Sequence, residues 1–314
     1  MIERTGNPSM SFSSEVKQEV LSIENKPCCS FAQSYGFLLF GRSFSASGLS
    51  FMTDHAVLAE AYAEALQQLG GGTVEPKRSE AGRYSVTLSD SKRCRRVLST
   101  LGYDGSEYRI RLNFANIRDD CCRAAFIRGA FLACGSVTDP EREYHLELTV
   151  GSKSLATDFM KLFDEYNSID PDQNYSLQPR LSTRGGVYLV YLKDSSSIED
   201  FLAIIGAQNA ALKMMNAKVF KDIKNNVNRR VNFETANINR SVNAAVTQID
   251  AIRKIMRYGA LGQLPEDMQH LAVLRLEEQE MSLRELGEAM RPPMSRAAVN
   301  YRLKKILEFA QQLP

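Results

Sequence analysis

The residues best suited to contact another molecule lie in one short stretch near the end of the chain, residues 281–310. Between Arg291 and Leu307 this stretch contains five basic residues and no acidic one. Guanidinium and carboxamide groups form paired hydrogen bonds to base edges in the major groove, and basic side chains neutralise phosphates. The stretch therefore predicts contact with double-stranded DNA. The residues expected to make that contact are Arg284, Ser295, Arg296, Asn300, Tyr301, Arg302, Lys304 and Lys305.

Two kinds of contact are expected from these side chains. Arg296 and Asn300, together with Ser295, are expected to read base edges, and each good bidentate pair contributes roughly 1 to 3 kcal/mol of discrimination. Tyr301 is expected to bond a phosphate or to pack on a sugar. The residues expected to neutralise phosphates are Arg284, Arg302, Lys304 and Lys305.

The first of two helices needed to position these residues is predicted by spacing. Leu283, Leu286 and Met290 recur at i, i+3 and i+7, which places them on one helical face. Ser282 stands at the N-cap position, and Glu285 follows three residues later. This is the capping-box pattern, in which the side chain of each residue accepts a hydrogen bond from the backbone N–H of the other.

The second helix follows a sharp turn. Pro292 and Pro293 cannot continue the first helix, because proline lacks the N–H that the helix interior requires. Ser295 can cap the next helix, whose inward face is Val299, Leu303 and Ile306. Two such helices form a helix-turn-helix, whose second helix enters the major groove. The alternative is an ordinary helical hairpin with a solvated basic face.

The composition is that of a globular protein with more than one domain. The chain has 314 residues, of which 44% are hydrophobic and 24% charged, and its net charge is +2. Contact with a nucleic acid must therefore come from local basic patches. No run of 18 or more apolar residues predicts a membrane span, and the polar start lacks a signal peptide. A cytoplasmic protein without a membrane partner is expected.

The cysteines do not show the spacing of a metal site. None of the six forms a C-x-x-C pair, and the chain has only three histidines. Reduced thiols are expected, with no metal and no cofactor. The glycine run at residues 70–72 lacks the Lys and Ser/Thr of a phosphate-binding loop. The cysteines are Cys28, Cys29, Cys94, Cys121, Cys122 and Cys134.

An internal duplication precedes this C-terminal region. The predicted order of helix, two strands, helix, two strands, helix occurs twice, and Gly135 follows the equivalent Gly41 by 94 residues. In the second copy, Ala125, Gly129 and Ala133 are small residues four apart, which allows close approach of another helix. We expect the two glycine-terminated helices to pack together and to join two pseudo-symmetric halves.

The two helix ends, residues 35–41 and 129–135, resemble the LAGLIDADG homing endonuclease fold. In that family the penultimate carboxylate of each helix binds the metal ions that drive cleavage. The corresponding residues here are Phe40 and Cys134, and neither supplies the hard oxygen ligand that magnesium prefers. The resemblance therefore implies a retained fold without nuclease chemistry, and so a protein that is not an enzyme.

The whole order of elements predicts an α+β chain: a duplicated LAGLIDADG-like αββαββα saddle followed by an all-α helix-turn-helix domain. A basic helical segment after residue 196 either is solvated or contacts phosphates, and a separate helix begins near residue 242. Either Met1 or Met10 is expected to be the initiator residue. The expected divisions are 1–10 as a disordered extension, 11–118 as an N-terminal helix and first repeat, 119–222 as the second repeat, 223–262 as a linker and helix, and 263–314 as the DNA-binding domain.

Four stretches in this order make the chain similar to the WhiA family of bacterial DNA-binding regulators. The resemblance implies a non-enzymatic, sequence-specific transcriptional regulator associated with the nucleoid, linked to cell division, chromosome segregation or sporulation. A partner regulator protein is a further expectation. The alternative is a nucleoid-associated division adaptor whose DNA binding is not regulatory. The stretches are MSFSSEVKQEV, RGAFLACGSVTDPEREYHLEL, VNRRVNFETANINRSVNAAVTQIDAIRKI and LRELGEAMRPPMSRAAVNYRLKKI.

Overall fold

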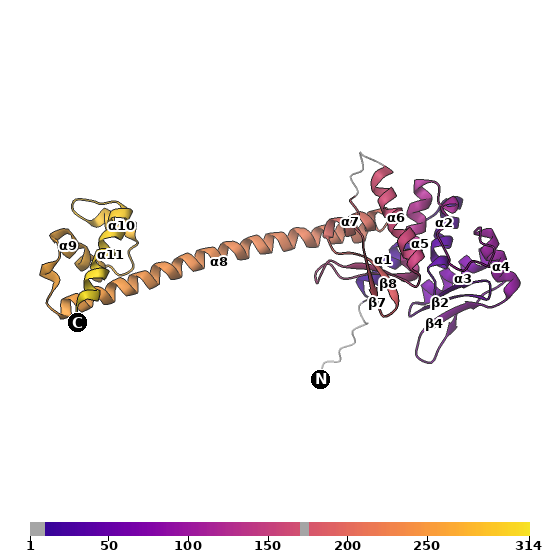
Figure 1. The fold of residues 1–314 in the computed structure, drawn as a ribbon, viewed down its shortest axis with the longest axis horizontal. Helices are drawn as coiled ribbons and strands as arrows, with labels where there is room; N and C mark the ends of the chain where they lie inside the picture. The colour runs from indigo at the N-terminus through magenta and orange to yellow at the C-terminus, as the bar shows by residue number, and fades with distance from the viewer. Residues whose placement is uncertain (1–9, 170–175) are drawn as a thin grey trace, which may run out of the picture. The chain divides into compact units, whose positions relative to one another are not determined.

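The computed structural model describes residues 10–169 and 176–314 (Figure 1). The chain forms two compact units, which meet in the sequence at Lys221 and Asp222. The first unit combines helices with antiparallel sheets, and the second is helical. Apart from Met10, the predicted N-terminal extension lies outside the described residues.

The first repeat of the N-terminal unit contains a four-stranded antiparallel sheet in the order β1-β2-β4-β3. The alternation of Tyr84, Val86 and Leu88 predicts β4, and in the structure Val86 and Leu88 are buried. The two-residue β3 is too short to show such alternation. The elements are α1 (Phe12–Leu21), α2 (Pro27–Leu39), β1 (Ser43–Ser45), β2 (Gly48–Thr53), α3 (Ala56–Gly70), β3 (Lys77–Arg78), β4 (Tyr84–Leu88) and α4 (Ser91–Thr100).

The second repeat has the same arrangement, with the sheet order β5-β6-β8-β7. A short 3-10 turn, Phe114–Asn116, precedes it. The recurrence of helix, two strands, helix, two strands, helix confirms the predicted duplication and the α+β class. The elements are α5 (Asp120–Cys134), β5 (Gly135–Val137), β6 (Leu146–Val150), α6 (Lys153–Ile169), β7 (Arg180–Arg184), β8 (Val187–Leu192) and α7 (Ser195–Ile204).

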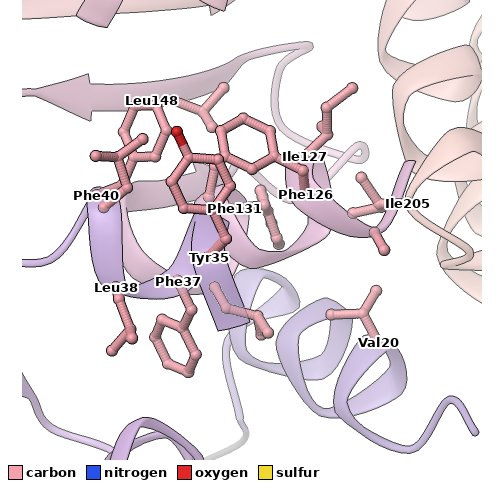
Figure 2. Close-up of a cluster of buried hydrophobic side chains, with 14 of the residues drawn as sticks. Val20, Tyr35, Phe37, Leu38, Phe40, Phe126, Ile127, Phe131, Leu148 and Ile205 are labelled. Atoms are coloured by element: carbon pink, nitrogen blue, oxygen red, sulfur yellow. The ribbon is translucent and has the colours of Figure 1, made fainter. Parts of the chain in front are cut away.

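Helices α2 and α5 pack backbone against backbone, as the small residues predict. A Cβ atom added to Gly129 would lie 2.0 Å from the carbonyl oxygen of Gln33 on α2. A Cβ atom added to Gly36 would lie 2.2 Å from the carbonyl oxygen of Phe126 on α5. Both distances are far below van der Waals contact, so only glycine permits this approach. The two repeats thus share one core, in which apolar side chains from both helices are buried (Figure 2).

Helix α8 (Gln208–Arg257) is a single helix of 50 residues. The sequence predicts two segments here, because asparagine is frequent between them. The structure joins them, because asparagine lowers helix propensity only modestly and the segment contains no glycine or proline. The helix lies between Gly206 and Gly259, whose φ angles of 86° and 65° are in the left-handed region.

The C-terminal unit contains the last part of α8, a 3-10 turn (Leu261–Gln263), α9 (Glu266–Glu277), α10 (Leu283–Ala289) and α11 (Arg296–Gln312). Its core is a separate apolar cluster with contributions from each of the four helices. Among the residues that the structure describes, none of the helices is both long and apolar enough to span a bilayer.

Candidate nucleic-acid interface

The first helix of the predicted helix-turn-helix begins with the expected capping box. The Oγ atom of Ser282 accepts a hydrogen bond from the backbone N–H of Glu285 at 3.3 Å, and the Glu285 carboxylate accepts one from the Ser282 N–H at 2.7 Å. The hydrogen bond from the Ser282 N–H lowers the pKa of the Glu285 carboxyl group. Local sequence spacing is enough to predict this cap, because all its partners lie within three residues.

The turn between α10 and α11 is tight. The backbone N–H of Met294 donates to the carbonyl of Gly287 at 2.9 Å, and a Cβ atom on Gly287 would lie 2.3 Å from the Met294 carbonyl oxygen. Ser295 caps α11, because its Oγ atom accepts from the Ala298 N–H at 3.2 Å. Val299 is buried against α10, as predicted.

A groove lies within the C-terminal unit, between α8 and the helix-turn-helix. We call it the basic groove; its volume is about 670 Å³. Of the described residues that line it, four are arginines and none is acidic. Its lining is Asn237, Arg240, Ser241, Ala244, Gln248, Arg275, Ser282, Leu283, Arg284, Arg296 and Asn300.

The basic groove brings three of the predicted DNA-contacting residues together: Arg284, Arg296 and Asn300. Arg296 and Asn300 are four residues apart at the start of α11 and are both exposed. Among the described residues Arg296 forms no ion pair, so its guanidinium group is available to a ligand. Arg284 is exposed and pairs with Glu288 at 2.8 Å.

The sequence alone does not single out the face that α8 presents to the groove. It consists of Asn237, Arg240, Ser241, Ala244 and Gln248. Counted from Asn237, they occur at i, i+3, i+4, i+7 and i+11, and this spacing is the signal that could have found them, since it marks one helical face. What the spacing cannot show is that this face lies beside α11, because that depends on tertiary packing.

Buried polar atoms form part of the groove lining. Arg275 is 3% exposed, and its Nη1 atom donates to the Met281 carbonyl oxygen. Its Nε atom and the Oε1 atom of the buried Gln248 have no hydrogen-bond partner among the described residues. Burial lowers the pKa of Arg275. An unpartnered donor and acceptor are costly inside a protein, and these two atoms lie buried in residues that line the groove.

The other predicted contact residues lie outside the groove. Arg302 is partly buried and donates from Nε to the carboxylate of Asp267 at 2.5 Å. Lys305 pairs with Glu308 at 2.7 Å and lies 5.9 Å from the ring centre of Tyr301, which is exposed. Lys304 and Ser295 are also exposed. Partners distant in sequence, such as Asp267, are not visible from the pattern of α11 alone.

The degenerate nuclease positions lie in an apolar setting in the N-terminal unit. The ring centre of Phe40 lies 5.1 Å from that of Phe159 and 6.0 Å from that of Phe126. The thiol of Cys134 donates to the Ala130 carbonyl at 3.3 Å, and desolvation raises its pKa to about 12.

A hollow of about 440 Å³ lies beside these two residues, and we call it the helix-end hollow. None of the described residues that line it carries a carboxylate. It therefore offers no ligand of the kind that magnesium prefers.

Comparison with known proteins covers both units. Residues 123–224 match the WhiA LAGLIDADG-like domain, and residues 227–310 match the WhiA C-terminal HTH domain. A probable cell division protein WhiA of Ruminiclostridium cellulolyticum is 34% identical over 316 residues, which span 97% of this chain and 98% of the relative. The corresponding protein of Desulforudis audaxviator is 36% identical over 315 residues, with the same coverage.

A solved structure has the same fold. The crystal structure of full-length DUF199/WhiA from Thermatoga maritima superposes with a TM-score of 0.58 at 24% identity, and the match covers 97% of this chain and 99% of that one. The resemblance drawn from the four sequence stretches is thereby confirmed. Because relatives more than 30% identical match almost from end to end, the chain belongs to the WhiA family.

Proposed function

We propose that this protein is a non-enzymatic, sequence-specific double-stranded DNA-binding protein and that it regulates transcription in connection with cell division. The observation that carries the proposal is the basic groove, where Arg284, Arg296 and Asn300 line one surface with Arg240. Curated relatives bear the name "Probable cell division protein WhiA", which supports the link to division.

The charge of the groove suits a nucleic acid. Of its four arginines, Arg240 and Arg296 form no ion pair among the described residues, Arg284 pairs with Glu288 outside the lining, and Arg275 is buried. Arginine on a concave surface attracts phosphates through charge and forms planar paired hydrogen bonds with them. The whole chain carries a net charge of only +2, so attraction to DNA depends on this local concentration of positive charge.

The start of α11 supplies groups that distinguish bases. Arg296 is the first residue of α11, and Asn300 is one turn later on the same face. In helix-turn-helix proteins the N-terminal residues of the second helix contact base edges. Arginine pairs with guanine and asparagine with adenine, which makes these two side chains the proposed base readers.

The remaining side chains would hold the DNA backbone. We assign phosphate contacts to Arg240 on α8 and to Lys304, Lys305 and Arg302 on α11, and a phosphate or sugar contact to Tyr301. Ser295 serves the α11 cap and lies next to the base-reading pair. The ion pairs of Arg302 and Lys305 are partly exposed, so exchanging them for phosphate contacts costs little.

The helix-end hollow supports a non-enzymatic role. A nuclease of the related fold needs metal-binding carboxylates there, and this chain has Phe40 and Cys134. Purified protein is expected to leave supercoiled plasmid intact in magnesium. Robust magnesium-dependent nicking that copurifies with the protein would contradict this.

Localisation and partners follow from the same proposal. A DNA-binding regulator of division genes is expected in the cytoplasm, on the nucleoid. A partner regulator protein would bind the N-terminal unit, whose nuclease role is lost.

Selection from a random duplex library with the full-length chain tests the proposal. We expect enrichment of a shared motif. Arg296→Ala/Asn300→Ala should weaken binding to the selected site roughly 30-fold or more, because two base contacts are lost. Arg257→Ala removes one exposed charge from the same unit outside the groove and is expected to bind within about twofold of wild type. No enriched motif, or a double variant that binds like wild type, would overturn the proposal.

A further inference from the structure

Four cysteines gather where α2 and α5 begin. Cys28 and Cys29 are the second and third residues of α2, and Cys121 and Cys122 are the second and third residues of α5. Their four Sγ atoms all lie within 4.8 Å of one another. We call this group the thiol cluster. Each helix thus contributes one vicinal pair at its N-terminal end, opposite to the end that holds Phe40 and Cys134.

We propose that the thiol cluster binds one zinc ion through four thiolates and that this ion joins the N-terminal ends of the two repeats. This goes beyond DNA binding and does not depend on it. The sequence predicts no metal site, because none of the cysteines forms a C-x-x-C pair. The pairs that the fold brings together are vicinal, and the second follows the first only after an entire repeat.

The spacing of the sulfur atoms fits a single tetrahedral ion. Zinc–sulfur bonds of about 2.3 Å place the four sulfurs of a tetrahedral site roughly 3.8 Å apart. The Sγ atoms of Cys28 and Cys29 are already 3.9 Å apart. No two Sγ atoms of the cluster are more than 4.8 Å apart, and rotation of the exposed Cys28 and Cys121 side chains can bring them closer. The ligand set is complete, since four thiolates satisfy a closed structural zinc site.

The chemistry of the ligands selects among metals. Thiolates are soft donors and favour zinc over magnesium or calcium, which prefer oxygen. An iron–sulfur cluster places iron and sulfide between its cysteines and so holds them further apart than one ion does. Four sulfurs within 4.8 Å therefore favour a mononuclear centre.

The helix ends would stabilise the charge of the loaded site. Four thiolates and one zinc ion carry a net charge of −2. Both pairs lie in the first turn of a helix, where unpaired N–H groups and the helix dipole favour negative charge. The N-cap residues Lys26 and Asp119 form no side-chain capping hydrogen bond, so their side chains do not compete for these donors.

Two of the four thiols are exposed to solvent and two are buried, which suits both the entry and the retention of an ion. Cys28 and Cys121 are exposed, whereas Cys29 and Cys122 are buried. The thiol of Cys29 donates to the carbonyl of Cys121 at 3.6 Å, so the two helices already touch here. An ion can enter from the exposed side and be held by the buried pair. It would then fix the ends of two helices whose middles are in backbone contact.

Metal analysis of the reduced, full-length protein tests this proposal. Wild type supplied with zinc and then desalted is expected to retain about one zinc ion per chain, the capacity of one Cys₄ site. Substitution with cobalt should give the sulfur-to-cobalt charge-transfer bands and the intense visible bands of a tetrahedral thiolate site. Cys28→Ser/Cys121→Ser, which changes only exposed members, should lose at least nine-tenths of the metal, about a tenfold reduction. Cys134→Ser, outside the cluster, should retain it.

A second measurement covers the case in which the double variant folds poorly. Adding zinc to metal-free wild type should raise its melting temperature by about 5 to 10 °C, because the ion binds the native state. Cys134→Ser should show the same shift. The proposal fails if wild type retains no more zinc than the double variant and shows no shift. It also fails if the cysteines are found as disulfides in protein isolated without reductant, or if the protein carries iron and sulfide.

Discussion

The helix-end hollow and the basic groove carry opposite chemistry, although each lies beside paired helices. In the hollow, Phe40 packs into an aromatic core and Cys134 bonds back to its own helix. In the groove, Arg240 and Arg296 form no ion pair among the described residues, and buried polar atoms of Arg275 and Gln248 have no partner. Phe40 and Cys134 thus find their partners within the protein, whereas the exposed side chains of Arg240 and Arg296 remain available to a ligand. A binding site is therefore recognised by what its side chains leave unsatisfied rather than by the fold that carries it.

The paired helices α2 and α5 show the same contrast on a smaller scale. At their C-terminal ends the lining of the hollow lacks carboxylates among the described residues. At their N-terminal ends four thiols face one another within 4.8 Å. The same helix pair thus lacks the ligands for a hard metal at one end and brings together ligands for a soft one at the other.

The largest effect is expected from restoring an acid at the hollow. Phe40→Asp should lower the free energy of unfolding by about 3 to 5 kcal/mol, because it removes a buried ring and places a charge among aromatic side chains. Urea denaturation followed by circular dichroism measures this. Met52→Asp adds the same acid at an exposed position lining the same hollow and should cost less than about 1 kcal/mol. If Phe40→Asp were as stable as wild type, the hollow would still tolerate a carboxylate side chain, contrary to this prediction.

A smaller decrease in the free energy of unfolding is expected from a substitution where α2 and α5 are in contact. Gly129→Ala should destabilise the N-terminal unit by about 2 to 3 kcal/mol, because the new Cβ atom would overlap the Gln33 carbonyl oxygen and push the helices apart. Gly151→Ala is the matched control, since nothing lies within 4 Å of its Cβ position, and it should stay within about 0.5 kcal/mol of wild type. Equal stability of the two variants would contradict the close helix contact.

A substitution of Arg240 tests whether α8 contributes to DNA binding in the groove. Arg240→Ala should weaken binding to selected and random DNA alike, by about 5- to 10-fold, and reduce the slope of log affinity against log salt by about 1. Fluorescence anisotropy over a salt series measures both. Arg253→Ala, also on α8 but outside the groove, should leave the slope unchanged. Loss of affinity confined to the selected site would instead make Arg240 a base reader.

The smallest effect on stability is expected from removing the ion pair between Arg302 and Asp267. The hydrogen bond from Arg302 holds the pKa of Asp267 below its ordinary value of about 4. A depressed carboxyl pKa adds stability above the unfolded value, and this stability is lost as the pH falls through the folded value. Asp267→Asn should therefore cost less than about 1 kcal/mol at pH 7, because the pair is partly exposed.

The difference between this variant and wild type should shrink as the pH falls through the folded pKa of Asp267, because the carboxyl group then becomes protonated in both states. Unfolding midpoints measured from pH 7 downward, as far as the protein stays folded, follow this change. Asp250→Asn is the control, since its partner Arg253 is 3.9 Å away and both side chains are exposed. A difference for Asp267→Asn that did not shrink as the pH was lowered would show that the loss comes from packing rather than from charge.

Sequence predicts the features whose partners are near in the chain. The caps at Ser282 and Ser295 and the inward face with Val299 depend on residues within one or two turns, and the structure confirms them. The duplicated saddle was also predictable, because its order of elements repeats and small residues mark the helix contact at Gly129.

Features that depend on tertiary packing were not predictable in this way. The face of α8 in the basic groove, the Asp267 partner of Arg302 and the thiol cluster each join residues from separate elements. Asparagine-rich sequence also suggested an interruption in α8, although no helix-breaking residue is present. In each case the sequence shows which residues are present, but it does not show which of them the fold brings into contact.

Genome-wide DNA occupancy of the intact protein beside Arg296→Ala/Asn300→Ala, measured in the native host, tests the central claim most directly. We predict sharp peaks that share one motif and disappear in the variant, because base reading depends on the start of α11. Broad occupancy that the variant leaves unchanged would contradict this account. It would place the DNA contact outside the basic groove and favour a nucleoid-associated adaptor of cell division.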